Sequence, residues 1–357
     1  MVLPTAPPAS LSVSQILTEF GIAAGTQKRL SNDLFPLVNG TAGATCSLAA
    51  SFSGKSQDTS VKFVAFTNDT TEFAYSTDGI TWTPSTMPTV SGYPNWYTSA
   101  SSPTTRRVVA IRQSNAQAAY SDNGTSWTLV SLPVSAYWQK ITCSSSGRFC
   151  AVSFNSADGI YSDDGSSWTA MSLPNNNSTG ITYSPTAGRF VVVTSGPDNR
   201  TAYSTNGVTW TNGGNLPSSN EWRFVICNSS GRLVAAPGAG GVGAYSDNGG
   251  TTWTSMNMPA SVRYFSGACS PTTGRFVVIT SATSGVAAYS DDGINWTAVT
   301  LPTASGTNYV NITCSSTGRF VAIGYMPGRA AYSDNGSSWN ISTISASTNI
   351  WLSVTNR

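Results

Sequence analysis

The sequence contains no histidine, and charged residues make up only 10% of its 357 residues. Without histidine, Ser-His-Asp and Cys-His catalysis are excluded, as is a histidine-ligated zinc site. The net charge is +2 and no basic block occurs, so the electrostatic footprint of nucleic-acid binding is missing. Glutamate occurs three times and lysine four times, and because both are strong helix formers, their scarcity favours strands and turns.

Other signals are missing as well. No apolar run approaches the ~18 residues of a membrane span. The N-terminus "MVLPTAPPAS" has neither the basic start nor the apolar core of a secretory signal. The six cysteines include no C-x-x-C pair, so neither a zinc site nor a redox motif is indicated. We therefore expect no metal, no cofactor, no membrane contact and no export by a signal peptide.

What the sequence does have is an internal repeat. The stretch "AYSDDGINWT" at residues 288–297 is one of seven similar stretches, each with one tryptophan. Successive tryptophans are 45, 41, 42, 43, 43 and 43 residues apart, which fits one four-stranded propeller blade per unit. The seven tryptophans are Trp82, Trp127, Trp168, Trp210, Trp253, Trp296 and Trp339.

Each unit has its own succession of strand and turn signals. In the unit 260–302, "YFSGACS" and the β-branched run "RFVVITS" predict two strands joined by the turn "PTTGR". "VAAYS" and "NWTAV" predict two more around the turn "DDGI". The fold class is therefore all-β. We predict a seven-bladed β-propeller of four-stranded blades over residues 42–357, preceded by a short coil and helical anchor at 1–41.

Two segments compete for the first strand of the first blade. The tail "NIWLSVTNR" (349–357) is similar to blade starts such as "YWQKITCSS" (137–145). A lone strand after seven units would close the ring by pairing inside the first blade. The alternative, "GATCSLAAS" (43–51), lacks the preceding aromatic residue and lies farther from the next strand. We expect the tail to close the ring.

The repeated turn contains adjacent acids, and Asp291 with Asp292 could act as general acid and base. In five of the six other copies the pair is Thr-Asp, Asp-Asn or Thr-Asn, and asparagine cannot replace a catalytic acid. We therefore expect both acids to bond the local backbone, with Gly293 permitting a tight turn and Trp296 packing between sheets. The second position of the pair is Asp78, Asn123, Asp164, Asn206, Asn248, Asp292 or Asn335.

This turn resembles the Asp-box, or BNR, repeat of sialidases and other β-propellers, whose pattern is S-x-D-x-G-x-T-W. The copy "SDNGGTTW" at 246–253 has the full length, with Asn248 at the Asp position, and the other copies are one residue shorter. The resemblance implies the propeller fold. It also raises an alternative function, a sialidase-like glycoside hydrolase acting on host surface polysaccharide.

The features of a sialidase site are not matched. Such enzymes have three clustered arginines and a Tyr-Glu nucleophile pair, whereas neither Glu72 nor Glu221 follows a tyrosine here. The arginines recur in a "GR[FL]" motif, so we expect repeated structural contacts rather than one site. We predict no catalytic residue and no enzymatic activity. The repeated arginines are Arg148, Arg189, Arg232, Arg275 and Arg319.

Aromatic residues at the blade starts are the candidate ligand-binding residues. They stand before the connectors and the variable second-to-third loops, which share one face of a propeller, and recognition usually lies on such loops. Exposed rings there could stack on sugars, and the alternative is packing between blades. The candidates are Trp96, Trp138, Trp222, Tyr264 and Tyr309.

The N-terminal segment differs from the repeats. Apolar residues at helical spacing in "SVSQILTEF" and "TQKRLSNDLFPLV" predict two short amphipathic helices that could dock onto a partner. Residues 12–16 and 19–21 resemble the N-termini of tailed-bacteriophage structural proteins, which often read "LP…GPISLSQI.TEFG"; here Ala6-Pro7-Pro8 replaces the usual Gly-Pro. The candidate docking residues are Ile16, Leu17, Phe20, Leu30, Leu34 and Phe35.

The resemblance implies a virion component, made in the host cytoplasm, whose N-terminus contacts other virion structural proteins. We therefore expect a phage appendage in a tail fibre, tail tip or capsid decoration. It would bind host surface carbohydrate or a virion partner, either as a single copy or as a homo-oligomer. The third alternative is a cellular scaffold propeller.

Overall fold

The computed structural model describes residues 60–196, 199–218, 221–238, 241–259, 263–281, 285–302, 308–325, 328–344 and 349–357. One compact unit runs from Val61 to Arg357. Within the described residues it consists of strands and contains no helix, which confirms the all-β prediction. The anchor 1–41, its boundary at residue 42 and the segment 43–51 lie outside the described residues.

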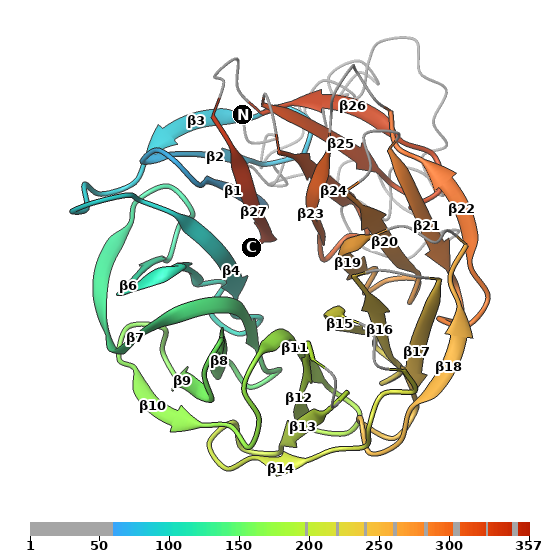
Figure 1. Cartoon of the computed structure of the whole chain (residues 1–357). Helices are drawn as coiled ribbons and strands as arrows, with labels where there is room; N and C mark the ends of the chain where they lie inside the picture. Colours follow the sequence, from blue (N-terminus) through green and yellow to red (C-terminus); the bar gives the residue numbers. More distant parts are fainter. Residues whose placement is uncertain are drawn as a thin grey trace, which may run out of the picture. The chain divides into compact units, whose positions relative to one another are not determined.

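The unit is a ring of twisted sheets around a central axis (Figure 1). Seven inner strands contact one another in a closed circle around this axis. Each inner strand lies at the beginning of one sequence repeat. In order around the ring they are β27 (Trp351–Asn356), β4 (Trp96–Ser101), the C-terminal half of β7 (Thr128–Cys143), β11 (Ser178–Ser184), β15 (Trp222–Cys227), β19 (Tyr264–Cys269) and β23 (Tyr309–Cys314).

The second strand of each repeat is the most deeply buried. Both of its faces are covered by neighbouring sheets, which explains why these segments read as continuous apolar runs rather than as alternating patterns. They are β1 (Phe63–Thr67), β5 (Val108–Arg112), β8 (Phe149–Phe154), β12 (Arg189–Thr194), β16 (Leu233–Pro237), β20 (Phe276–Thr280) and β24 (Phe320–Gly324).

The third and fourth strands lie toward the rim. The third strands are β2 (Glu72–Ser76), β6 (Ser114–Ser121), β9 (Asp158–Ser162), β13 (Thr201–Ser204), β17 (Val242–Ser246), β21 (Val286–Ser290) and β25 (Arg329–Ser333). The fourth strands, whose side chains are mostly exposed, are β3 (Thr83–Thr86), the N-terminal half of β7, β10 (Thr169–Ser172), β14 (Thr211–Asn212), β18 (Thr254–Asn257), β22 (Thr297–Thr300) and β26 (Asn340–Thr343).

Hydrogen bonding groups these strands into six sheets, five with four strands and one with seven. The seven-stranded sheet arises because β7 continues without a break from one repeat into the next. Its first half pairs with β6, as in Thr128 opposite Tyr120, and its second half pairs with β8, as in Cys143 opposite Phe149. The seven repeats are thus distributed over six sheets, not over seven separate ones.

The sheet that begins the ring contains both ends of the described unit. β27 pairs antiparallel with β1, so that Phe63 lies opposite Asn356 and Ala65 opposite Val354. The order β27-β1-β2-β3 places this strand at the inner edge, the position that the sequence analysis gave to the tail (Figure 1). A strand from the far end of the chain therefore completes the first sheet.

The turn between the third and fourth strands is built around one side chain. Oδ1 of Asp292 accepts hydrogen bonds from the backbone N–H groups of Ile294 and Asn295, both at 2.8 Å, and from the hydroxyl of Ser290 at 2.9 Å. Burial alone would raise the pKa of Asp292, but these donors hold that pKa well below its usual range. Gly293 has φ +74°, the left-handed conformation that this turn requires.

Five of the other turns repeat this pattern, whether the residue is Asp or Asn, whereas in the longer turn of the fifth repeat Oδ1 of Asn248 accepts one backbone N–H, that of Thr252 at 3.0 Å. Oδ1 of Asn123, for example, accepts the N–H groups of Thr125 and Ser126 at 2.9 and 2.8 Å. The tryptophan after the turn lies between sheets, as Trp296 shows. Its ring lies 6.4 Å from that of Phe276 in its own sheet, and its N–H points to the sulfur of Met256 in the preceding one.

The first acid of the pair has a different partner. Asp291 forms a two-pronged ion pair with Arg275, at 2.6 and 2.9 Å, so the expectation that both acids bond the backbone was wrong for Asp291. Nη1 of Arg275 also donates, at 2.6 Å, to the carbonyl of Asn335 in the next repeat's turn. Five arginines make this double contact, which we call the arginine bridge: Arg107, Arg148, Arg232, Arg275 and Arg319.

Two repeats depart from the arginine bridge. Arg189 has Thr205 where the others have aspartate, and its Nε and Nη1 have no hydrogen-bond partner within the described residues, although its guanidinium lies 4.6 Å over Tyr203. The first repeat has Lys62 instead of arginine. There Arg357, from the segment after β27, donates to the carbonyl of Asp122 and takes over the contact with the second repeat.

We predict that the two adjacent acids contribute unequally to stability. Asp292→Ala removes the shared acceptor of two backbone N–H groups and one hydroxyl, and should lower the free energy of unfolding by about 1–2 kcal/mol. Asp291→Ala removes an ion pair whose carboxylate is 65% exposed, and should cost about 0.5 kcal/mol. Chemical denaturation of both variants measures the difference, and equal losses would contradict the assignment.

Asp292→Asn is the matched control, because asparagine already holds this turn in four repeats. At pH 7 it should be close to wild type. As the pH falls below about 4, the wild-type protein loses the stability that comes from the lowered pKa of Asp292, whereas Asp292→Asn does not.

Candidate binding face and central channel

The five aromatic residues proposed to bind ligand are core residues. They are at most 2% exposed, and each is the first residue of an inner strand, where it fills the space between two sheets. Trp138, for example, packs with Ile111 of the preceding repeat and Phe149 of its own. A buried ring cannot stack on a sugar, which corrects the prediction for Trp96, Trp138, Trp222, Tyr264 and Tyr309.

A β-bulge follows the first residue of every inner strand. The pairing register shifts there in all seven, as between Trp138 and Lys140 or between Trp222 and Phe224. A bulge leaves one residue outside the ladder and redirects its side chain. The unpaired residues lie at the end of the inner strands that adjoins the connectors and the second-to-third loops. We call them the bulge residues: Tyr97, Gln139, Thr179, Arg223, Phe265, Val310 and Leu352.

Four bulge residues form a polar and aromatic cluster. Tyr97 interacts with Gln139 and lies within electrostatic range of Arg223, and burial raises the pKa of its hydroxyl. The guanidinium of Arg223 lies 4.9 Å over the ring of Phe265. Glu221 contacts Arg223 at 3.4 Å and thereby balances part of its charge. The bulge residues differ from repeat to repeat, whereas the strands are similar in sequence. The bulge residues therefore determine which polar, charged and aromatic groups lie at this end of the central axis.

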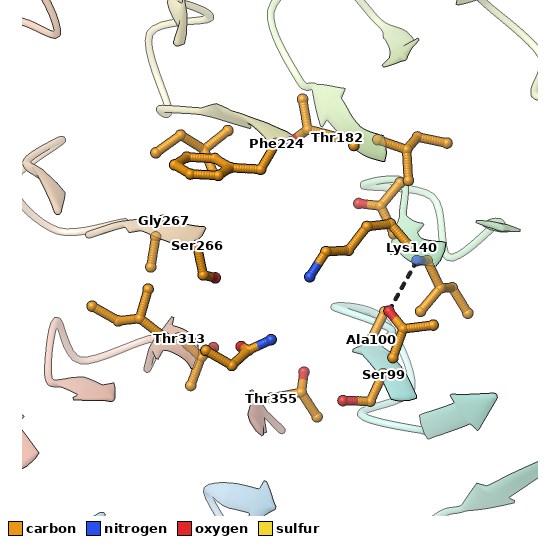
Figure 2. A pocket seen from close by; sticks show the side chains of 18 of the residues that line it. Ser99, Ala100, Lys140, Thr182, Phe224, Ser266, Gly267, Thr313 and Thr355 are labelled. Atoms are coloured by element: carbon orange, nitrogen blue, oxygen red, sulfur yellow. Dashed lines mark hydrogen bonds between the residues drawn. The ribbon is translucent and has the colours of Figure 1, made fainter. Parts of the chain in front are cut away.

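Beyond the bulge residues lies a central channel with a volume of about 340 Å³. Its wall consists of the inner strands and presents mainly hydroxyl, thiol and small apolar side chains. Lys140 is the one charged residue in this wall, among the described residues that line the channel. Figure 2 shows its amine pointing into the space between Ser99, Ser266, Thr313 and Thr355.

The environment of Lys140 disfavours its charge. Burial, and after it the nearby positive charge of Arg223, lower the pKa of Lys140 to about 8. The equivalent positions in the other repeats are neutral: Thr98, Gly180, Phe224, Ser266, Asn311 and Ser353. Lys140 is therefore the one charged residue among these seven equivalent positions, and it lies in the wall of the central channel.

Exposed aromatic rings lie on the same face of the ring as the bulge residues. Tyr93 is 57% exposed, Tyr137 is 41% exposed and Tyr325 is 38% exposed. Tyr93 belongs to the connector before β4, Tyr137 to the crossing point within β7, and Tyr325 follows β24. All three are thus on the connectors or second-to-third loops. This is the face predicted from the sequence to bind a ligand, although the aromatic residues predicted there were different ones.

The connector that carries Tyr93 is held by Arg112. This arginine is only 2% exposed, and its guanidinium donates to the carbonyls of Pro94 at 2.8 Å, Ser91 at 3.0 Å and Tyr93 at 2.6 Å. Beside the connector is a hollow of about 320 Å³ lined by Tyr93, Arg112 and neighbouring polar residues. The ring of Tyr93 is therefore exposed, while the backbone of its connector is held by hydrogen bonds from the buried Arg112.

The remaining predicted residues are placed as follows. The docking residues Ile16, Leu17, Phe20, Leu30, Leu34 and Phe35 lie outside the described residues. The turn residues and their tryptophans lie at the opposite end of the sheets from the loop face. No group of three or more possible metal ligands, and no helix able to cross a membrane, occurs within the described parts of the chain.

Sequence reasoning missed Lys140, Arg223 and the three exposed tyrosines. A signal for Lys140 was present, because an alignment of the repeats puts a charge where the other copies have none. For Tyr137 the signal was hidden, since it stands beside Trp138 and only the fold shows which of the two rings is buried.

No protein-family model and no curated protein matches the chain. Solved structures similar to it include virginiamycin B lyase from Staphylococcus aureus, with 14% identity over 70% of this chain and 84% of that chain and a TM-score of 0.61. YCF48 from Cyanidioschyzon merolae has 13% identity over 71% and 86% of the two chains and a TM-score of 0.54. A chain of the nidogen/laminin complex has 9% identity over 83% and 98%, with a TM-score of 0.52.

These neighbours are β-propeller proteins, and identities this low establish the fold alone. One of them is named as a lyase, and the names of the other two state no activity. The fold therefore does not decide between catalysis and binding, and the chemistry of the loop face has to be considered instead.

We predict that Lys140→Met stabilises the protein at pH 7 by about 1 kcal/mol, less than the full pKa shift implies because solvent reaches the channel. The unfolded chain keeps this proton up to about pH 10.5, whereas the folded protein releases it near pH 8. Wild-type stability therefore rises between these values and the advantage of the variant disappears. Denaturation at pH 7 and above pH 10 measures this, and Lys62→Met, outside the channel, should show no gain.

Proposed function

We propose that this chain is a non-enzymatic binding protein of a bacteriophage particle. Its N-terminal segment docks onto a virion partner, and its propeller presents the loop face to host surface glycan. The observation that carries the binding part is the arrangement of Tyr93, Tyr137 and Tyr325, three exposed rings on one face of a rigid ring of sheets. Exposed aromatic rings with a polar tip are suited to stacking on sugars.

The chemistry of the loop face supports this proposal. Tyr137 stands beside the cluster of Tyr97, Gln139 and Arg223, so a ring for stacking is accompanied by hydrogen-bond donors and acceptors. Carbohydrate recognition needs this combination of apolar faces and oriented polar groups. The connectors and loops can differ between repeats without disturbing the strands, which suits a surface that recognises a variable partner.

Particle attachment is supported by the N-terminal segment. Residues 12–16 and 19–21 carry the resemblance to tailed-phage structural proteins, and the segment stands apart in composition from the repeats. The proposal covers a tail fibre, a tail tip or a capsid decoration, either as a single copy or as a homo-oligomer.

The glycoside hydrolase alternative requires two carboxylates placed about 5–9 Å apart around a sugar. The two glutamates of the described residues are otherwise engaged. Glu72 accepts a hydrogen bond from Asn349 at 2.6 Å, and Glu221 pairs with Arg223 and Arg263. These contacts favour binding over hydrolysis. Turnover of a host polysaccharide that is abolished by one acidic substitution would reverse this preference. The cellular scaffold alternative fits the fold and lacks the N-terminal resemblance.

We predict that a variant lacking residues 1–41 folds normally and is absent from purified particles. The described unit begins only at Val61 and closes its ring without the anchor, so its melting temperature should be unchanged. Immunodetection on particles assembled with the truncated protein measures incorporation. Normal incorporation of the truncated chain would contradict the anchoring role, as would failure to find the full-length chain on wild-type particles.

We predict that Tyr93→Ala and Tyr137→Ala each weaken binding of the purified protein to host cells by about three- to tenfold, the worth of one stacked ring. Ile341→Ala is the matched control, since Ile341 is a 51% exposed apolar residue on the rim strand β26. Binding that falls equally in all three variants would point to general surface hydrophobicity instead of the loop face.

A further inference from the structure

The amine of Lys140 has no counter-charge in the channel. The described residues that line the channel include no carboxylate, and no hydrogen bond or ion pair is formed by this amine within the described residues. The nearest charge with an effect on it is that of Arg223, which has the same sign. Lys140 thus differs from the arginines of the bridge, each of which meets an aspartate.

A half-buried cation without a partner is unfavourable, because it loses part of its hydration and gains no hydrogen bond from the described wall in return. Lys140 nevertheless stands where six other repeats have neutral side chains. The wall near it presents hydroxyl groups in several directions, among them those of Ser266, Thr313 and Thr355 (Figure 2). The hydroxyls of Thr313 and Thr355 donate to Asn356 at 3.3 and 3.2 Å, so each would turn from that acceptor to reach an anion. The channel holds about ten water volumes, at roughly 30 Å³ each, so a small ion and its remaining waters fit inside it.

We propose that the central channel is a binding site for a small oxyanion, held by the ammonium group of Lys140 and the surrounding hydroxyl groups. Arg223 at the loop-face end contributes a second positive charge that attracts the anion toward the axis. The oxyanion is either a free ion or the acidic group of a larger ligand that reaches in from the loop face. This site goes beyond the proposed function and does not depend on glycan binding or on particles.

Bound anion would stabilise the charged form of the lysine, so binding should depend on pH through Lys140. The other titratable side chains of the channel wall are Cys143 on β7, Cys227 on β15, Cys269 on β19 and Cys314 on β23. Burial raises the pKa of each, to about 11 for Cys227 and about 12 for Cys143 and Cys314. The neighbouring Tyr97 also has a raised pKa. Between about pH 6.5 and 9.5, therefore, the group that changes is Lys140.

The test uses the full chain with inorganic phosphate as a free ion, glucuronate as an acidic group on a sugar, and glucose as the neutral control. The chain has only four lysines, so the NMR signals of isotope-labelled methylated lysines are few, and Lys140→Met assigns the one in the channel. We expect phosphate to shift the Lys140 signal saturably and to raise its pKa by about one unit, with glucose inactive. Calorimetric affinity for glucuronate, whose carboxylate stays ionised throughout, should fall by up to about tenfold from about pH 6.5 to 9.5.

Variants separate binding from folding. Lys140→Met should abolish saturable binding, Lys140→Arg should retain it, and Lys62→Met should bind as wild type does. Binding of both phosphate and glucuronate indicates a site for free and attached oxyanions, whereas phosphate alone limits it to free ions. Absence of a saturable Lys140 shift with either probe, or equal binding by Lys140→Met, overturns the proposal. If the tyrosine variants lose host-cell binding but phosphate still shifts their Lys140 signal saturably, the anion site is independent of glycan binding.

Discussion

The arginine bridge is the side-chain contact that recurs most regularly between neighbouring repeats, at five of the seven junctions. Each bridging guanidinium is fixed by an aspartate of its own turn and donates to a backbone carbonyl in the turn of the next repeat, as Arg275 does with Asp291 and Asn335. A backbone acceptor does not change with the side chain of the neighbour, which explains why Asp and Asn are equally acceptable there. The bridge lies at one end of the sheets, so the other end is free to vary.

This difference between the two ends of the sheets explains which side chains recur in every repeat and which vary. Acidic pairs, arginines and tryptophans recur at the turn end because each repeat needs the same contacts with its neighbour. At the loop end the inner strands begin with a buried aromatic residue and a bulge, after which the side chains differ from repeat to repeat. Lys140, Arg223 and Tyr137 all lie at this loop end, where the residues are not repeated from one unit to the next.

Periodicity made most of the fold predictable. Tryptophan spacing predicted blade-like units, and the resemblance of 349–357 to a blade start pointed to the strand that pairs with β1. The exposure of aromatic residues was not predictable in the same way. Trp138 and Tyr137 are adjacent in the sequence, and the pairing register of β7 with β8 decides which of the two side chains lies between the sheets. The continuity of β7 was also hidden, because a connector and a strand have similar composition there.

The seven bulges give this fold an unusual freedom to change. Each lifts one side chain out of the hydrogen-bonded ladder at the same height around the axis, so a change of that side chain leaves the pairing of the strands in place. A substitution at Tyr97, Gln139, Arg223 or Phe265 alters the rim of the channel without altering the sheets beneath. Seven positions that vary independently provide many combinations of charge, size and polarity, so a lineage carrying this scaffold could track a changing target by single substitutions.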